Sequence, residues 1–63
     1  MCLSTVYKNT KAPDTVVMKN VTAISCKDGM VILTDLMDRQ VAIQGHLAEA
    51  NLVDGVVLVI EEK

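Results

Sequence analysis

Two Asp-Gly pairs constrain the fold of this chain more than any other sequence feature. Asp28-Gly29 and Asp54-Gly55 each lie between runs of apolar and β-branched residues. A type I′ turn needs positive φ at both central residues, which Asp and Gly tolerate, so each pair predicts a two-residue hairpin loop. The first loop predicts four facing pairs, namely Lys27 with Met30, Cys26 with Val31, Ser25 with Ile32 and Ile24 with Leu33.

The second Asp-Gly pair predicts a hairpin between strands 47–53 and 56–60. Residues 46–51 could instead form a helical turn, but six residues are too few for a stable isolated helix. The predicted facing pairs are Val53 with Val56, Leu52 with Val57 and Ala50 with Val59. The strand 56–60 is apolar on both faces, whereas an antiparallel strand with one wet face would alternate. We therefore expect its second face to be covered, most simply by another subunit.

The rest of the chain also has the pattern of short strands. Residues 2–8 are expected to form a first strand, whose alternate side chains point to opposite sides, with Leu3, Thr5 and Tyr7 on one side and Cys2, Ser4, Val6 and Lys8 on the other. Residues 39–44 alternate again, with Val41 and Ile43 directed inward. Residues 15–27 are rich in β-branched side chains, and their alternation slips by one residue near Thr22-Ala23, which predicts a β-bulge. Gly45 permits a kink between two strands. Residues 9–14 are expected to form a loop, and residues 35–38 a turn with solvated carboxylates.

These elements predict an all-β fold in a single domain that covers residues 1–63. We expect a small antiparallel SH3-like barrel or a rolled sheet of five to six short strands. The chain has one Tyr and no Phe or Trp, so the core should be aliphatic. A hydrophobic share of 51% is high for 63 residues, and the excess apolar surface favours a homodimer interface.

Charge and segment lengths exclude several classes of function. The net charge of −2 argues against nucleic-acid binding, which needs a basic patch. The longest apolar run, residues 56–60, is too short to span a membrane. There is no charged region followed by an apolar segment, so we expect no signal peptide and a cytoplasmic protein with both thiols reduced. No catalytic spacing of Ser, Cys, His and Asp stands out, so we do not expect an enzyme.

Cys2 carries the most specific chemistry in the chain. If Met1 is removed, Cys2 offers its own amine and thiolate, which close a five-membered chelate ring. If Met1 stays, its amine, the deprotonated Cys2 amide and the Cys2 thiolate can bind in sequence. Both versions place nitrogen and sulfur in one plane, which suits Ni(II) and Cu(II). The alternative is that Cys2 is a small packed residue at the start of a strand.

Cys26 and His46 are the other residues that could bind a metal. Cys26 falls on the apolar face of the first hairpin, so it is predicted to be a core residue that behaves as a small hydrophobe. His46 is the only histidine and is expected to be a surface residue at a turn. Neutral imidazole binds the same borderline metals, so an additional ligand role for His46 is the alternative.

The chain resembles the CooT family of small nickel-binding accessory proteins of carbon monoxide dehydrogenase. The resemblance lies in Met1-Cys2-Leu3, in residues 21–26 and 31–36 around a tight turn, and in residues 52–58. It implies a homodimer that binds Ni(II) through Cys2 of both subunits, with the main-chain nitrogens of Met1 and Cys2 as co-ligands. It also implies delivery of nickel to the dehydrogenase or to its maturation proteins.

Two alternatives from other functional classes remain open at the level of sequence. One is a metal-independent β-barrel interaction module in which Cys2 has no special role. The other is an RNA-binding module, whose affinity for single-stranded oligonucleotides would fall steeply with salt. Indifference of the protein to nickel would favour the first alternative.

Overall fold

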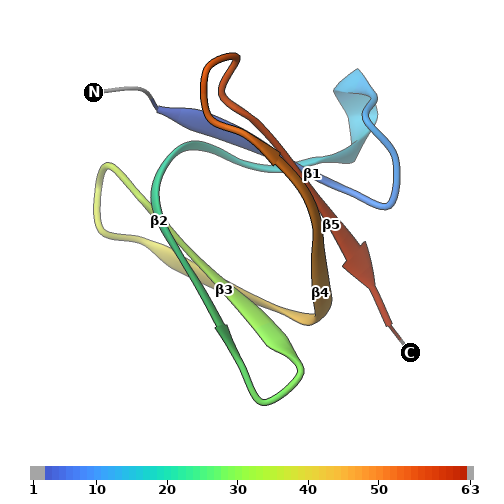
Figure 1. Ribbon diagram of the computed structural model, residues 1–63. Helices are drawn as coiled ribbons and strands as arrows, with labels where there is room; N and C mark the ends of the chain where they lie inside the picture. Colours follow the sequence, from blue (N-terminus) through green and yellow to red (C-terminus); the bar gives the residue numbers. More distant parts are fainter. Residues whose placement is uncertain (1–2, 63) are drawn as a thin grey trace.

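Residues 3–62, which the computed structural model describes, form a closed five-stranded β-barrel (Figure 1). The strands are β1 (Ser4–Lys8), β2 (Val16–Lys27), β3 (Met30–Asp35), β4 (Gln40–Asn51) and β5 (Val56–Glu61), and one 3-10 turn (Pro13–Thr15) precedes β2. The all-β class predicted from sequence is confirmed. Neighbouring strands are antiparallel, but β5 closes onto β1 in parallel. Closure requires this, because in an up-and-down run of five strands the first and the last point the same way. None of the described residues forms a helix that could cross a membrane.

The core is aliphatic, as the composition predicts. Inward-facing residues alternate along β1, β3 and β5, so every second side chain of these strands is buried. The buried hydrophobic residues are Val6, Met18, Val21, Val31, Leu33, Ile43, Val57 and Val59. At about 25 cal/mol per Å² of buried apolar surface, such a core is the main source of stability. Because only eight hydrophobic residues between residues 3 and 62 are buried, much of the apolar content there lies near the surface.

The first hairpin and the bulge are confirmed as predicted. Asp28 and Gly29 have φ of 52° and 76°, and all four predicted pairs between β2 and β3 occur. The register of β2 against β3 shifts between Val21 and Ala23. Residues before the shift pair with β1, and those after it pair only with β3 among the described strands. The bulge therefore lies where β2 passes from one neighbour to the other.

The predicted register of the second hairpin is wrong. In the structure β4 ends at Asn51, which pairs with Val56, and four residues rather than two make the connection. The Asn51 side-chain oxygen accepts hydrogen bonds from the backbone N–H groups of Val53 (3.2 Å) and Asp54 (3.0 Å). An Asn side chain that bonds its own backbone a few residues on favours such a turn over continued pairing. Gly55, with φ of 71°, completes the loop.

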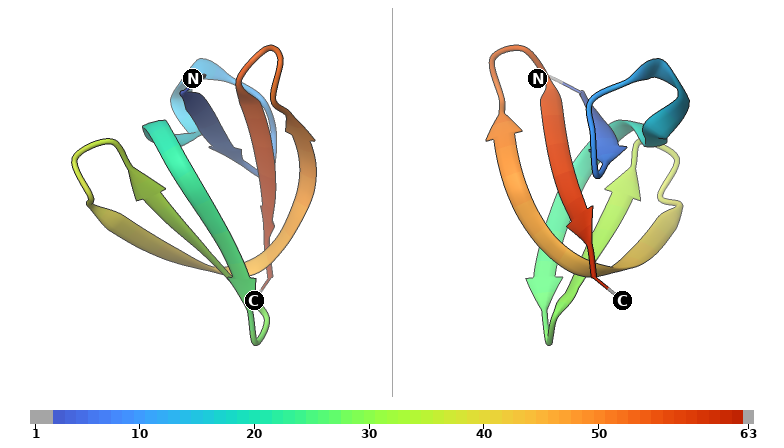
Figure 2. Two further views of the ribbon diagram at one scale, coloured as in Figure 1. Left: turned by 60° about the vertical axis from the view of Figure 1, so that its left-hand side comes forward. Right: turned by 90° about the vertical axis from the view of Figure 1, so that its right-hand side faces the viewer.

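The strands predicted at residues 39–44 and 47–53 are one bent strand, β4, which runs from Gln40 to Asn51. Its first half pairs with β3 and its second half pairs with β5. Figure 2 shows that β4 curves strongly between these two neighbours. The change of partner occurs at Gly45, where the Ile60 carbonyl oxygen fills the space that a Cβ would need. Val41 and Ile43 do face inward, as predicted.

The predicted turn with solvated carboxylates at residues 35–38 is wrong for Asp35, whereas Asp38 is exposed as expected. The Asp35 residue is only 4% exposed. Its carboxylate accepts hydrogen bonds from the backbone N–H groups of Arg39 and Met37 (both 2.9 Å) and from Arg39 Nε (2.8 Å). The hydrogen bond from the Arg39 backbone is the largest cause that holds the pKa of Asp35 below its ordinary value of 3.8, against desolvation. The turn from β3 to β4 is thus fixed by one buried carboxylate.

Stability in acid should therefore depend on Asp35. Its folded pKa is depressed, so the ionised carboxylate stabilises the fold above the unfolded value near 3.8, and this stabilisation is lost as pH falls through the folded pKa. We expect Asp35→Asn to lower the melting temperature at neutral pH and to flatten its fall below about pH 4. Thermal unfolding followed by circular dichroism from pH 2 to 7 measures both effects. Asp14→Asn, at an exposed site, is the control; an unchanged curve for Asp35→Asn would contradict this role.

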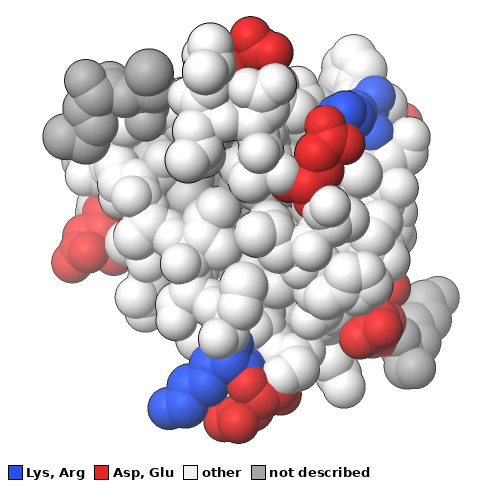
Figure 3. Space-filling view, viewed as in Figure 1, with Lys and Arg blue, Asp and Glu red and all other residues white. Residues whose placement is uncertain are grey.

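Charged side chains lie around the margin of the face seen in Figure 1. Figure 3, in the same view, shows an uncharged centre with acidic and basic groups at its edges. Two ion pairs join neighbouring elements, Lys8 to Glu61 (3.4 Å) and Lys11 to Glu49 (2.9 Å). Their side chains are 36–48% exposed, so each pair contributes little stability, about 0–1 kcal/mol.

Candidate metal centre

The start of the chain is held at the rim of the barrel. Met1 and Cys2, the predicted metal residues, lie outside the described residues, as does the predicted strand end at Cys2. Ser4 is buried and pairs with Val21. The Thr5 N–H donates to the Gly55 carbonyl oxygen (2.8 Å), and a Cβ on Gly55 would lie 2.9 Å from the Leu3 carbonyl oxygen. The chain is therefore fixed between β2 and the end of the β4–β5 loop from its first described residues onward.

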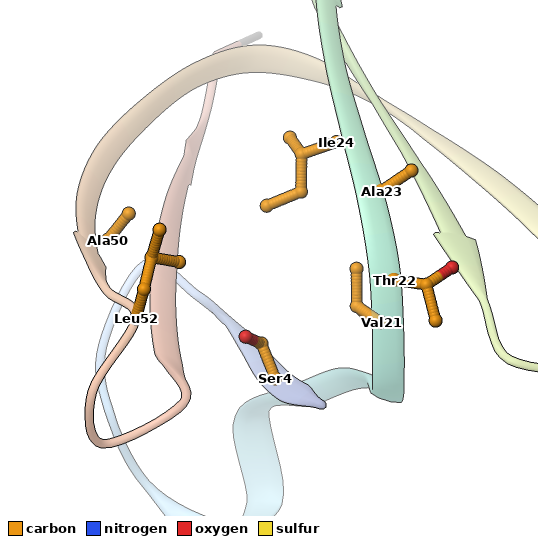
Figure 4. A pocket seen from close by; sticks show the side chains of 7 residues that line it. All are labelled: Ser4, Val21, Thr22, Ala23, Ile24, Ala50 and Leu52. Atoms are coloured by element: carbon orange, nitrogen blue, oxygen red, sulfur yellow. The ribbon is translucent and has the colours of Figure 1, made fainter. Parts of the chain in front are cut away.

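An open groove adjoins this start (Figure 4). Its volume is about 490 Å³, and it lies between the second half of β2 and the end of β4. Ile24 and Leu52 face it from opposite sides, and Ser4 lies at its lower end in the view. The lining residues carry no charge; they are Ser4, Val21, Thr22, Ala23, Ile24, Ala50 and Leu52. The groove thus offers apolar contact but no charged ligand for a metal.

Cys26 is exposed, so its prediction as a core residue is wrong. Its partner Val31 is fully buried, as the alternation predicts. Cys26 lies beyond Val21, where β1 stops pairing with β2, near the hairpin end of the strand. Alternation gives the face of a residue, whereas burial depends on what packs over that face.

His46 is exposed, as predicted, but it lies within β4 rather than at a turn. Its Nδ1 is 3.5 Å from a carboxylate oxygen of Glu62. Within residues 3–62, no three side chains of His, Cys, Asp or Glu come together in a group that could hold a metal ion. The sequence-based metal hypothesis therefore depends on Cys2 and its neighbours.

Sequence reasoning did not find the groove. It arises because β1 stops pairing with β2 at Val21 while β4 turns away toward β5. The small residues Ala23 and Ala50, at positions where strands usually carry larger side chains, were the only local signal. The two alanines indicate a groove only once β2 and β4 are known to face each other across it.

Comparison with known proteins identifies the family. The family model for the CO dehydrogenase accessory protein CooT matches residues 1–60, which is nearly the whole chain and includes Met1 and Cys2. A search of curated proteins gave no match. The family is one of accessory proteins rather than catalysts, and its named client is CO dehydrogenase. The chain therefore belongs to the family of the CO dehydrogenase accessory protein CooT.

Proposed function

We propose that this protein binds Ni(II) through Cys2 of two subunits and helps to deliver it to carbon monoxide dehydrogenase. The observation that carries the proposal is the family match, which extends over a chain that opens with Met1-Cys2. An accessory protein of a nickel enzyme has a direct use for a nickel-binding thiolate. Nickel is cargo in this proposal, received and passed on rather than kept for a reaction.

The donor chemistry favours nickel over the hard cations. Thiolate and main-chain nitrogen are poor ligands for Mg²⁺ and Ca²⁺ but good ligands for planar Ni(II). One Cys2 with its adjacent nitrogens leaves a planar ion short of donors, whereas two copies supply two thiolates and at least two nitrogens. Binding releases protons from thiols, and from amides where these bind, so nickel affinity should rise with pH.

The anchored start of the chain supports this site. Cys2 is two residues before Ser4, and two residues of extended chain span about 7 Å. The donors are thus tethered to the barrel rim, where Ser4 is buried and Thr5 is hydrogen-bonded to Gly55. A rigid base close to the donors reduces the entropy lost when they are ordered around the metal. A short tether also leaves the metal accessible to an incoming ligand from the receiving protein.

A nickel titration of the reduced protein, followed by visible absorption, tests the proposal. We expect thiolate-to-nickel bands that saturate at one metal per two chains. Saturation at one metal per chain would contradict a site shared by two subunits. The absence of any bands would contradict nickel binding by Cys2 altogether and would leave a metal-independent interaction module.

A further inference from the structure

A second pocket lies between the first half of β2 and the start of β4. Its volume is about 470 Å³, and its lining residues do not overlap with those of the groove beside the chain start. The pocket arises because β3 pairs with β2 only back to Val21, while β4 begins to pair with β3 at Gln40. The lining residues are Val17, Met18, Lys19, Asn20, Asp35, Arg39, Gln40 and Val41.

Two cations line this pocket, and only one carboxylate stands against them among its lining residues. Asp35 is buried and already accepts hydrogen bonds from Arg39 Nε (2.8 Å) and from two backbone N–H groups. Lys19 is exposed and forms no ion pair within the described chain, unlike Lys8 and Lys11. Two positive charges and one negative charge leave the lining at +1, in a chain whose net charge is −2. The pocket therefore suits a singly charged anion.

The guanidinium of Arg39 is positioned to bind a carboxylate. Its Nε is held by one oxygen of Asp35, and the Arg39 backbone N–H donates to the other (2.9 Å). Among residues 3–62 its two terminal nitrogens have no partner, and the Arg39 side chain is 75% exposed. A guanidinium presents its N–H groups as a planar fork that matches the two oxygens of a carboxylate. Asp35 thus orients the fork before a ligand arrives, which reduces the entropy lost on binding.

Apolar side chains accompany these cations. Val17, Met18 and Val41 line the pocket, and Leu36 and Met37 of the adjoining turn are 59% and 72% exposed. The turn between β3 and β4 lies at the outer margin of the barrel in both views of Figure 2. Large exposed apolar side chains beside a polar pocket are typical of contacts with another protein. A small free anion would use the cations but would leave these apolar side chains in water.

We propose that this pocket, together with Leu36 and Met37, binds a segment of a partner protein in which an acidic side chain is flanked by apolar residues. The carboxylate binds the terminal nitrogens of Arg39, and Lys19 contributes the second positive charge. The flanking side chains cover Leu36 and Met37. A lining charge of +1 favours a carboxylate over a phosphate group, which carries a charge of about −1.5 to −2. The contact needs no metal, so it goes beyond the proposed nickel function and does not depend on it.

NMR measurement of amide chemical shifts during a peptide titration tests this inference. The probe is the peptide acetyl-Gly-Leu-Glu-Leu-Gly-amide, and its counterpart with Gln in place of Glu lacks only the charge. We expect the glutamate peptide to shift the amides of residues 17–20 and 36–41. The glutamine peptide should bind at least about 10-fold more weakly, because it loses the hydrogen bonds between charged groups.

Variants of the two cations test the assignment of the site. Lys19→Gln and Arg39→Gln should each weaken binding of the glutamate peptide at least about 10-fold. Lys27→Gln is the matched control, because Lys27 is also an exposed lysine of β2 with no ion pair in the described chain, but it does not line the pocket. Arg39→Lys keeps the charge and loses the fork, so its affinity should lie between those of Arg39→Gln and the wild type. Circular dichroism establishes folding, and Lys19→Gln keeps the test open if loss of the Asp35 partner unfolds Arg39→Gln.

Several results would overturn the inference. They are the absence of these amide shifts, equal affinity for the two peptides, and a folded Lys19→Gln or Arg39→Gln variant that binds as tightly as the wild type. Inorganic phosphate, titrated at the same ionic strength, provides the remaining comparison. If phosphate shifted the same amides with equal affinity, the pocket would be a general anion site, and recognition of a protein segment would be wrong.

Discussion

Replacing Cys2 with serine is expected to weaken nickel binding by at least about 100-fold. Removal of an outer-shell partner of a ligand weakens metal binding by about 10- to 100-fold, and removal of the ligand itself should cost at least as much. The effect should be large because a site shared by two subunits loses both of its thiolates in one substitution. A hydroxyl stays protonated near neutral pH and is a poor ligand for a borderline metal. Isothermal titration and the loss of the thiolate-to-nickel absorption bands measure the change.

The matched control for this variant is Cys26→Ser. The chain has two cysteines, and Cys26 is exposed on the second half of β2. Its replacement should leave nickel affinity unchanged. If Cys2→Ser bound nickel as tightly as the wild type, or if Cys26→Ser lost the metal, the donors would have to lie elsewhere. Thermal unfolding of Cys26→Ser in the absence of metal should match the wild type, since Cys26 is exposed.

Gly45→Ala is expected to destabilise the barrel by about 3 kcal/mol, the upper end of the usual cost of overpacking. The added methyl group would collide with the Ile60 carbonyl oxygen and would lie 3.0 Å from the Glu61 Cα. Both are backbone atoms of β5, so they cannot move away as a flexible side chain could. For a domain of this size the melting temperature should fall by roughly 15 °C or more.

Gly29→Ala provides the comparison, because its cost has a different cause. No atom lies within 4 Å of a Cβ at Gly29, but its φ of 76° is unfavourable for alanine. We expect a loss of about 1 kcal/mol there, from backbone strain alone. Thermal or urea unfolding of the two variants separates a steric collision from a conformational penalty. Equal losses would contradict the close approach of β4 and β5 at Gly45.

The two Asp-Gly pairs illustrate how far local sequence determines this fold. At Asp28-Gly29 the turn preference and the alternation of both flanking strands agree, and the predicted register is correct at every pair. At Asp54-Gly55 the same preference is overridden by Asn51, whose side chain bonds the backbone of residues 53 and 54. Local rules therefore predict a connection well only when no neighbouring side chain competes for the same backbone groups.

Burial at the open side of the barrel could not be predicted in this way. The exposure of Cys26 depends on where β1 stops pairing with β2, and the groove depends on where β4 leaves β3. Both are contacts between segments distant in sequence. Asp35 is a further case, because its burial depends on an Arg side chain and backbone donors that assemble only in the turn. The metal role proposed for Cys2, by contrast, rests on thiolate chemistry and the family match, and no long-range contact was needed to propose it.

X-ray absorption at the nickel edge counts the sulfur donors around the metal and so distinguishes a site shared by two subunits from a site within one. The measurement should use the Cys26→Ser variant loaded with nickel, because Cys2 is then the only cysteine in the chain. We expect two sulfur donors per nickel in a planar site, with nitrogen as the remaining donors. Since each chain then holds one thiol, two sulfurs on one metal require two subunits. A nickel ion with one sulfur donor, or with only nitrogen and oxygen donors, would contradict a site shared through Cys2.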